Sequence, residues 1–166
     1  MRMSLFALVT FLCALGAGLT AGIFYAFSTF VMAALARLPP ADGIAAMNSI
    51  NVAVINPWFM AVFLGTPLLC AVAAVLALTN WSSSGSALIL AAALLYVAGS
   101  FLVTIIFNVP LNDALATVTP ASSEGALIWQ RYLAEWTFWN HVRTAAPIAA
   151  MAFFIIGLLL QRNSAV

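Results

Sequence analysis

Long apolar runs alternate with short polar segments along the whole chain. Four runs stand out, at residues 5–35, 58–78, 87–107 and 142–160, and together they hold a single charged residue. A helix needs about 20 mainly apolar residues to cross the hydrocarbon core of a bilayer. The pattern therefore predicts four transmembrane helices. We find no internal repeat and no second domain, so residues 1–166 are expected to form one unit.

The segments between these runs predict where the chain turns. Residues 80–85, Asn-Trp-Ser-Ser-Ser-Gly, suit a short flexible turn. Residues 38–43 form a helix stop that precedes a moderately apolar stretch, and Asn56 followed by proline suits a helix entry. The longest connection is expected at residues 108–140. The predicted fold class is an all-α integral membrane protein, a four-transmembrane-helix bundle with a long amphipathic or helical connection between helices three and four.

Composition supports lipid as the solvent of this chain. Hydrophobic residues make up 66% and charged residues 5%, whereas soluble domains hold about 45–50% and 25%. Five arginines and no lysine give no basic patch, which argues against a nucleic-acid partner. The first run is longer than the apolar core of a signal peptide, which has about 7–15 residues, so we interpret it as an uncleaved span. We expect a multi-pass protein of the cell membrane, surrounded by membrane lipids and able to form a homo-oligomer.

The few cysteines and ionisable residues limit cofactor chemistry. Cys13 and Cys70 lie inside apolar runs and are expected to behave as small free hydrophobes. One histidine and four scattered acids offer few ligands for a metal centre, and their spacing matches no zinc, haem or iron–sulfur pattern. We therefore expect neither a metal nor another cofactor.

The alternating direction of the four predicted spans brings polar residues from distant segments to one membrane face. With four spans, the first and third connections share a side, and the termini lie on the other. At 1.5 Å per residue, a span that begins near Leu5 reaches the side of these connections near Tyr25. The residues expected to converge there are Tyr25, Asn51, Asn56, Asn108, Asn112, Trp136, Asn140, His141 and Arg143. We interpret this convergence as the candidate functional site.

The densest polar and aromatic cluster is residues 136–144. On a helix, Trp136, Asn140 and Arg143 share one face, and His141 lies about 100° away from Asn140. Two interpretations remain open, an interfacial anchor and a pocket that binds an anion or an enolate. Three interpretations of His141 also remain open: a proton acceptor, a hydrogen-bonded interfacial residue and, less favoured, a metal ligand.

Other segments add candidates from the remaining helices. Asn108 and Asn112 flank a proline that breaks the helical hydrogen-bond ladder, so they either cap the helix end or line a pocket. Gly18 and Gly22 lie four residues apart and predict a close helix–helix contact, either within the bundle or between subunits. Tyr25, one turn further on, is predicted to point into the bundle.

Four sequence elements together resemble the anthrone oxygenase family, small four-helix membrane proteins long grouped as domain-of-unknown-function family 1772. They are residues 21–28, 47–51 and 108–112 and the Trp-x-x-Trp-Asn-x-x-Arg-Thr element at 136–144, which is the most specific. The resemblance covers nearly the whole chain. It implies oxidation of an anthrone to an anthraquinone by dioxygen without an evident metal or flavin. It brings no established catalytic residues, and most bacterial members have no assigned activity.

Such an oxidation needs a base, stabilisation of an oxyanion and a dry aromatic slot. We expect His141 to act as the base, and Arg143, Asn140 and Asn108 to stabilise the oxyanion. The expected substrate-binding residues are Tyr25, Asn51, Asn112, Trp136 and Trp139. The predicted function is a cofactor-independent oxygenase acting on a hydrophobic aromatic ketone. The alternative is a non-enzymatic membrane module that binds a quinone-like or lipid ligand, or a subunit of a larger complex.

Overall fold

The computed structural model describes residues 4–163, and the side chains of residues 4–161. Every regular element in this range is helical. The elements are α1 (Leu5–Ala26), η1 (Phe27–Val31), α2 (Met32–Leu35), α3 (Pro40–Ala53), α4 (Pro57–Thr79), α5 (Ser86–Tyr96), η2 (Val97–Leu102), η3 (Thr104–Asn108), α6 (Val109–Ala116) and α7 (Ser123–Asn163). The three η elements are π-helical turns that continue the helices beside them.

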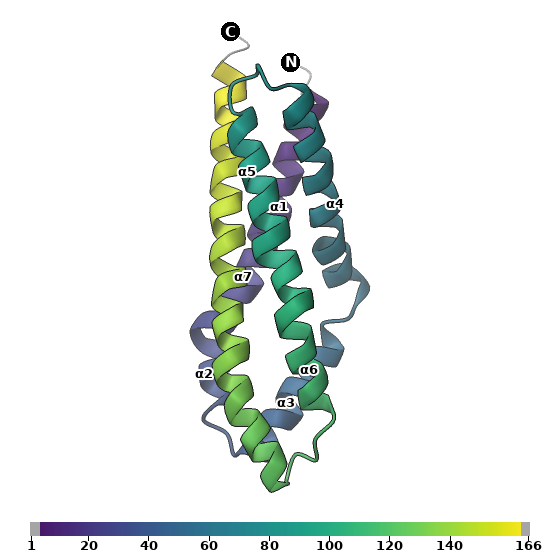
Figure 1. The fold of residues 1–166 in the computed structure, drawn as a ribbon, viewed down its shortest axis with the longest axis vertical. Coiled ribbons are helices and arrows are strands. Elements are labelled where there is room, and N and C mark those ends of the chain that lie inside the picture. The colour runs from purple at the N-terminus through teal and green to yellow at the C-terminus, as the bar shows by residue number, and fades with distance from the viewer. Residues whose placement is uncertain (1–3, 164–166) are drawn as a thin grey trace.

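Four long helical segments are apolar enough to cross a membrane, which confirms the central prediction. They are Leu5–Leu35, Pro57–Thr79, Ser86–Ala116 and Ser123–Gln161. The α7 helix packs against α1 and α5, and α4 packs against the other side of the same two helices. The start of α1, the α4–α5 turn and the end of α7 lie at one end of the molecule, and α2, α3 and the α6–α7 connection lie at the other (Figure 1).

The third and fourth segments extend beyond the predicted spans. The expected connection at residues 108–140 is almost entirely helical, and only residues 117–122 separate α6 from α7. The reason is a buried stripe of large side chains along α7. Trp129, Tyr132, Trp136 and Asn140 recur every three or four residues and are all buried, as one face of a helix requires.

Prolines start helices at two of the turns. Pro40 is the first residue of α3, and Pro57 is the first residue of α4. A proline suits this position because the first helical N–H has no partner within the helix. Asn56 caps α4 as expected, since its Oδ1 accepts hydrogen bonds from the backbone N–H groups of Trp58 and Phe59, both at 3.1 Å.

Two of the three π-helical turns, η1 and η3, lie beside the candidate site, next to an interhelical hydrogen bond and a proline. At the α1–η1 junction, Asn140 Nδ2 donates a hydrogen bond to the backbone oxygen of Phe24 at 2.8 Å. The η3 turn comes directly before Pro110, which has no N–H to donate to the preceding turn. Such widened turns often occur at functional sites, because they move a side chain or a carbonyl out of the regular register.

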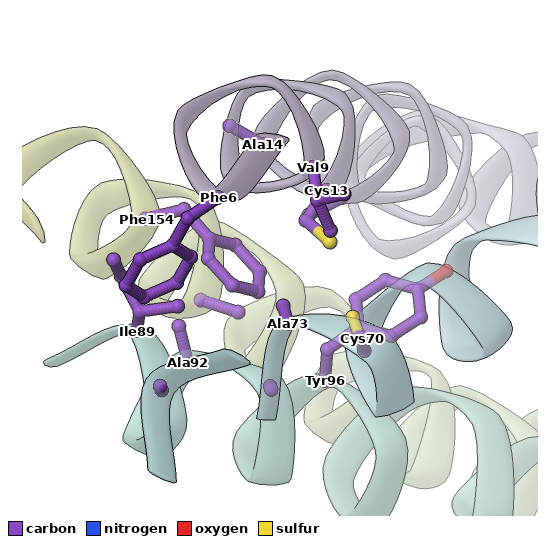
Figure 2. Close-up of a cluster of buried hydrophobic side chains, with 14 residues drawn as sticks. Phe6, Val9, Cys13, Ala14, Cys70, Ala73, Ile89, Ala92, Tyr96 and Phe154 are labelled. Carbon is purple, nitrogen blue, oxygen red and sulfur yellow. The ribbon is translucent and has the colours of Figure 1, made fainter. Parts of the chain in front are cut away.

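The half of the bundle near the termini has a closely packed core of small side chains, here called the terminal-side core. Figure 2 shows Phe6, Ile89 and Phe154 grouped together, and the sulfur atoms of Cys13 and Cys70 on side chains that face each other. Both cysteines are free and buried, as predicted. The terminal-side core consists of Phe6, Val9, Cys13, Ala14, Ala17, Cys70, Ala73, Ala77, Ile89, Ala92, Ala93, Tyr96, Ala150 and Phe154.

The predicted glycine stripe is half correct. A Cβ atom added at Gly18 would lie 2.9 Å from the sulfur of Met151 on α7, so this glycine does make a close contact. Gly22 is exposed and has nothing within 4 Å of such an atom. Gly22 therefore makes no close contact within the bundle, and a contact between subunits at this position stays a prediction. The tight contact between α1 and α4 lies instead at Gly16, which faces Thr66.

A second core lies at the opposite end of the molecule, here called the loop-side core. Its members come from α2, α3, α6 and α7 and include the large aromatic side chains of the stripe on α7. They are Met32, Leu35, Ile44, Met47, Leu115, Trp129, Tyr132 and Trp136. Gly43 on α3 allows Trp129 to approach, since an added Cβ would lie 2.7 Å from the indole ring.

Candidate functional site

Arg143 is the centre of a buried polar network on α7. Its side chain is only 6% exposed. Its Nε donates a hydrogen bond to Asn140 Oδ1 at 3.0 Å, and an Nη donates to Thr104 Oγ1 at 3.4 Å. The guanidinium carbon lies 4.1 Å from the ring centroid of Phe24 and 4.7 Å from that of Trp136. Two aromatic rings thus flank the cation, an arrangement that stabilises a desolvated guanidinium.

The guanidinium has no carboxylate partner within the described side chains. Their one ion pair joins Arg131 and Glu135 at 2.8 Å on the exposed face of α7. Glu135 is therefore paired with Arg131 and not with Arg143, which lies about two turns further along α7. A buried cation without a counter-charge is costly in a membrane. Guanidinium carries five N–H donors, and the two hydrogen bonds above use two of them.

Asn140 positions the arginine. It is fully buried, and its Nδ2 donates to the backbone oxygen of Phe24 at 2.8 Å and to Ser28 Oγ at 2.7 Å. Its Oδ1 accepts the hydrogen bond from Arg143 Nε. Both ends of the amide are therefore engaged. This geometry assigns Asn140 to joining α1 and α7 and orienting Arg143, and leaves it no donor for a ligand oxygen.

Asn112 and Asn108 hold the aromatic stripe of α7 in place. Asn112 Oδ1 accepts hydrogen bonds from the Tyr132 hydroxyl at 2.7 Å and from Trp136 Nε1 at 2.8 Å. Asn108 Nδ2 donates to the backbone oxygen of Trp136 at 3.1 Å, while its Oδ1 is buried without a partner. The rings of Tyr132 and Trp136 are nearly parallel, with centroids 5.7 Å apart. These contacts fix the indole over the guanidinium.

A cavity of about 570 Å³ lies next to this network. It lies within the size range of small-molecule sites, about 300–1,000 Å³. Most of its wall is aliphatic or aromatic, and α4 contributes its first two turns. Its polar lining residues are Asn48 and Asn51 on α3, Thr104 on η3, Asn112 and Asp113 on α6, and Arg143 on α7. The apolar ones include Phe24, Phe27, Met47, Phe59, Phe63, Val109 and Trp136.

Four of the nine predicted site residues line this cavity: Asn51, Asn112, Trp136 and Arg143. Asn108 and Asn140 are buried behind its wall. Tyr25, His141 and Trp139 are not among the lining residues.

The expectation that Tyr25 points into the bundle is wrong, since its side chain is 55% exposed. Successive helical residues point about 100° apart, and the preceding residue, Phe24, takes the inward position. His141 is exposed for the same reason, because Asn140 takes the inward position on α7. Trp139 stacks on Phe107 with centroids 3.6 Å apart, outside the cavity.

Sequence reasoning missed Asp113, Asn48 and the aromatic partner Phe24. Asp113 lines the cavity together with Val109, Asn112 and Ala116, which are spaced as one face of a helix. That spacing is visible in the sequence, but the expectation of an amphipathic or helical connection at residues 108–140 did not specify which residues share a helix face. Nothing in the local pattern marks Phe24 as the ring that contacts a guanidinium.

The described residues contain no group of three or more His, Cys, Asp or Glu side chains arranged to hold a metal ion. The polar lining instead combines one cation, one carboxylate and several amides with an apolar wall. Such a surface can bind a flat apolar molecule, hold a negatively charged oxygen on Arg143 and accept a proton on Asp113.

Comparison with known proteins adds the family. The sequence matches the anthrone oxygenase family over residues 58–153. This region contains α4, α5, α6 and the first three quarters of α7, and so includes Asn112, Asp113, Trp136 and Arg143. No curated protein and no solved structure matches the chain. The match covers more than half of the chain, which therefore belongs to the anthrone oxygenase family.

Proposed function

We propose that the protein is an oxygenase of the cell membrane that oxidises a flat, hydrophobic aromatic ketone with dioxygen, as in the conversion of an anthrone to an anthraquinone. The observation that carries this proposal is Arg143, a buried guanidinium that lines an apolar cavity and has no carboxylate partner among the described side chains. Membership of the family supports an oxygenase-like role in general. The residues that line the cavity support the more specific proposal about the substrate and the reaction.

The first step is removal of a proton from the carbon opposite the ketone. The resulting anion places its negative charge largely on the ketone oxygen. Arg143 can donate a charge-assisted hydrogen bond to that oxygen, and Phe24 and Trp136 keep the guanidinium fixed. Prearranged donors of this kind stabilise developing charge most effectively where water is excluded.

Asp113 is the candidate base. It is the one acidic residue among the described residues that line the cavity, whereas His141 lies outside. Asp113 follows Asn112 on α6, and both residues line the cavity. One positive and one negative group on one apolar surface provide the two charges that proton removal needs.

The oxidation balances without an added reductant. The substrate anion passes one electron to dioxygen, and the two radicals combine to form a C–O bond and a hydroperoxide at the same carbon. Loss of the second proton from that carbon breaks the O–O bond and forms the new carbonyl. One oxygen atom remains in the product, and the other leaves as water after hydroxide takes up a proton. The apolar wall protects the anion from water until dioxygen reacts.

The position of the cavity fits a substrate that arrives from lipid. Arg143 lies about 18 residues before the end of the span Ser123–Gln161, or about 27 Å at 1.5 Å per residue. A hydrocarbon core is about 30 Å thick. The cavity therefore lies near one boundary of the membrane core, where a flat apolar ketone concentrates.

The test is anthrone consumption measured together with dioxygen uptake by purified protein in lipid nanodiscs. Arg143→Met removes the charge and keeps a similar length, and should lower the turnover rate by roughly 10²–10³-fold. Arg131→Met is the matched control, because Arg131 is exposed and paired only with Glu135. It should change the rate by no more than about twofold. Binding of anthrone by the wild type without dioxygen uptake would contradict the oxygenase and support a binding module.

A further inference from the structure

The cavity beside Arg143 opens sideways, between α4 and the segment formed by η3 and α6. Leu64 on α4 and Ile105 on η3 line the cavity and are also exposed, and Val52 and Ile55 on α3 line it while they are 74% and 72% exposed. A side chain that both lines a cavity and is exposed lies at the rim of that cavity. Because Leu64 and Ile105 belong to two of the membrane-length helices, this part of the opening faces hydrocarbon rather than water.

The lipid-facing part of the rim extends from Arg143 toward the centre of the bilayer. Arg143 is level with Thr104, to which it donates a hydrogen bond. Phe63 on α4 contacts Phe101, three residues before Thr104 and closer to the termini, with ring centroids 5.5 Å apart. Leu64 therefore lies deeper in the membrane than the guanidinium. A ligand with a polar end on Arg143 can extend an apolar chain along this rim into the bilayer.

The guanidinium is suited to a small anion with two oxygens. Its Nε donates to Asn140 and one Nη donates to Thr104, while none of its hydrogen bonds to the described residues uses the second Nη. A carboxylate can accept hydrogen bonds from two guanidinium nitrogens at once. The phosphate of a phospholipid carries a glycerol and two chains, whereas Arg143 is only 6% exposed. A carboxylate on a single chain fits this site better.

The acidic side chain of the cavity does not oppose such a ligand. Asp113 is nine residues past Thr104, or about 13 Å at 1.5 Å per residue, on the side away from the bilayer centre. It is also exposed, and charges separated by more than about 10 Å are largely screened at ordinary salt concentrations. The positive charge of Arg143 therefore dominates at the inner end of the opening.

We propose that the cavity binds a long-chain fatty acid, with its carboxylate on Arg143 and its chain passing out between Leu64 and Ile105 into the bilayer. The ligand enters from the lipid in its ordinary orientation, since its carboxylate stays near the membrane boundary. This site goes beyond the proposed function, because it involves no oxidation. The carboxylate takes the same donors as the ketone oxygen, so a fatty acid should compete with the ketone for Arg143.

Quenching of tryptophan fluorescence tests the proposal, because Trp136 lines the cavity. The probes are 9,10-dibromostearate and its methyl ester, which share a quenching chain and differ in the carboxylate. In phosphatidylcholine nanodiscs at about pH 8, where the acid is ionised, the wild type should be half-quenched at a roughly 10- to 100-fold lower mole fraction of the acid than of the ester. Arg143→Met should remove this preference. Arg131→Met, an exposed arginine outside the cavity, should keep it.

A second pair of variants tests the opening without altering the charge. Ile105 and Ile106 are both exposed, but only Ile105 lines the cavity. Ile105→Phe should narrow the opening and raise the mole fraction of acid needed for half-quenching by roughly 10-fold. Ile106→Phe should change it by no more than about twofold.

Equal quenching by the acid and the ester in the wild type, a preference retained in R143M, or equal effects of I105F and I106F would overturn the proposal. Nanodiscs that also contain phosphatidylglycerol distinguish the two lipid sources of an anion. The affinity for the acid should be unchanged in them, and displacement of the acid would instead assign Arg143 to a phospholipid phosphate. These measurements involve no turnover, so their outcome is independent of whether the protein oxidises anthrone.

Discussion

The two halves of the bundle use the same helices in different ways. In the terminal-side core, alanines and cysteines on α1, α4, α5 and α7 let the backbones approach, and most of the side chains are completely buried. In the loop-side half, hydrogen bonds join tryptophan, tyrosine, arginine and asparagine side chains, and a cavity of about 570 Å³ remains beside them. The terminal-side half is therefore closely packed, and the loop-side half carries the polar lining of the cavity.

The difference follows from where the helices begin. The α4 helix starts at Pro57, so it is absent from the loop-side end, where the shorter α3 takes its place. Small side chains would leave this wider space empty, whereas the large rings of α7 fill part of it. Polar groups on α3, α6 and α7 fix those rings, and the remaining volume is the cavity. Substitutions in the two halves should therefore affect different properties.

The largest effect is expected from the cavity carboxylate. Asp113→Asn should slow anthrone oxidation by roughly 10²–10⁴-fold, the usual contribution of a positioned general base, while leaving the thermal melting profile unchanged. His141→Gln is the comparison, because His141 is the other candidate base but faces outward. It should change the rate by no more than about twofold, within the range expected for a surface substitution.

Initial rates of anthrone consumption under saturating dioxygen measure both variants. Asp42→Asn, in the exposed first turn of α3, controls for the loss of a carboxylate elsewhere. A slow H141Q and a fast D113N would reverse the assignment of the base and restore the prediction made from the sequence.

The second effect concerns stability in the terminal-side core. Phe154 is fully buried there, and Phe154→Ala should cost about 3–5 kcal/mol, because the lost transfer free energy of the ring adds to the cost of the cavity that it leaves. Phe11→Ala is the matched control, because Phe11 is 43% exposed on the outer face of α1. It should cost less than about 0.5 kcal/mol. Reversible unfolding in detergent measures both, and equal losses would show that this core contributes no more than the outer face.

The fold was largely predictable from the sequence because hydrophobic length is a local property. Four apolar runs predicted four membrane-length helices, and residues 38–43 and 80–85 predicted the turns between them. The helical register of residues 108–140 was not predicted, because four charged residues and Pro110 obscured the helical repeat. Their effect is small, since three of the charges lie at exposed positions, Glu135 is partly exposed, and the proline lies at the start of α6.

The site was only partly predictable because it depends on how each helix is rotated about its own axis. The spacing of Trp136, Asn140 and Arg143 correctly placed them on one face of α7, but no local signal says which neighbouring residue of α1 faces them. Phe24 rather than Tyr25 takes that place, a rotation of about 100°. The rotation of each helix about its axis is set by its packing against the other helices. The sequence of α1 alone therefore does not show which of its residues faces α7.

The smallest effect separates two glycines six residues apart on α1. An added Cβ at Gly16 would overlap Thr66 Oγ1 and lie 2.9 Å from Thr66 Cγ2. Thr66 is buried, β-branched and hydrogen-bonded to the backbone oxygen of Val62 at 2.7 Å, so it cannot move aside. Gly16→Ala should therefore separate α1 from α4 and cost about 1–2 kcal/mol, the range for overpacking less the better helix propensity of alanine.

Gly22→Ala is the matched control, because its added Cβ meets nothing within 4 Å. It should leave stability unchanged or raise it by up to about 1 kcal/mol, since alanine favours the helix over glycine. Unfolding in detergent distinguishes the two variants. A loss of stability in G22A that depends on protein concentration would show that the outer face of α1 contacts another copy of the chain, in which case the small residues of this helix serve assembly as well as the terminal-side core.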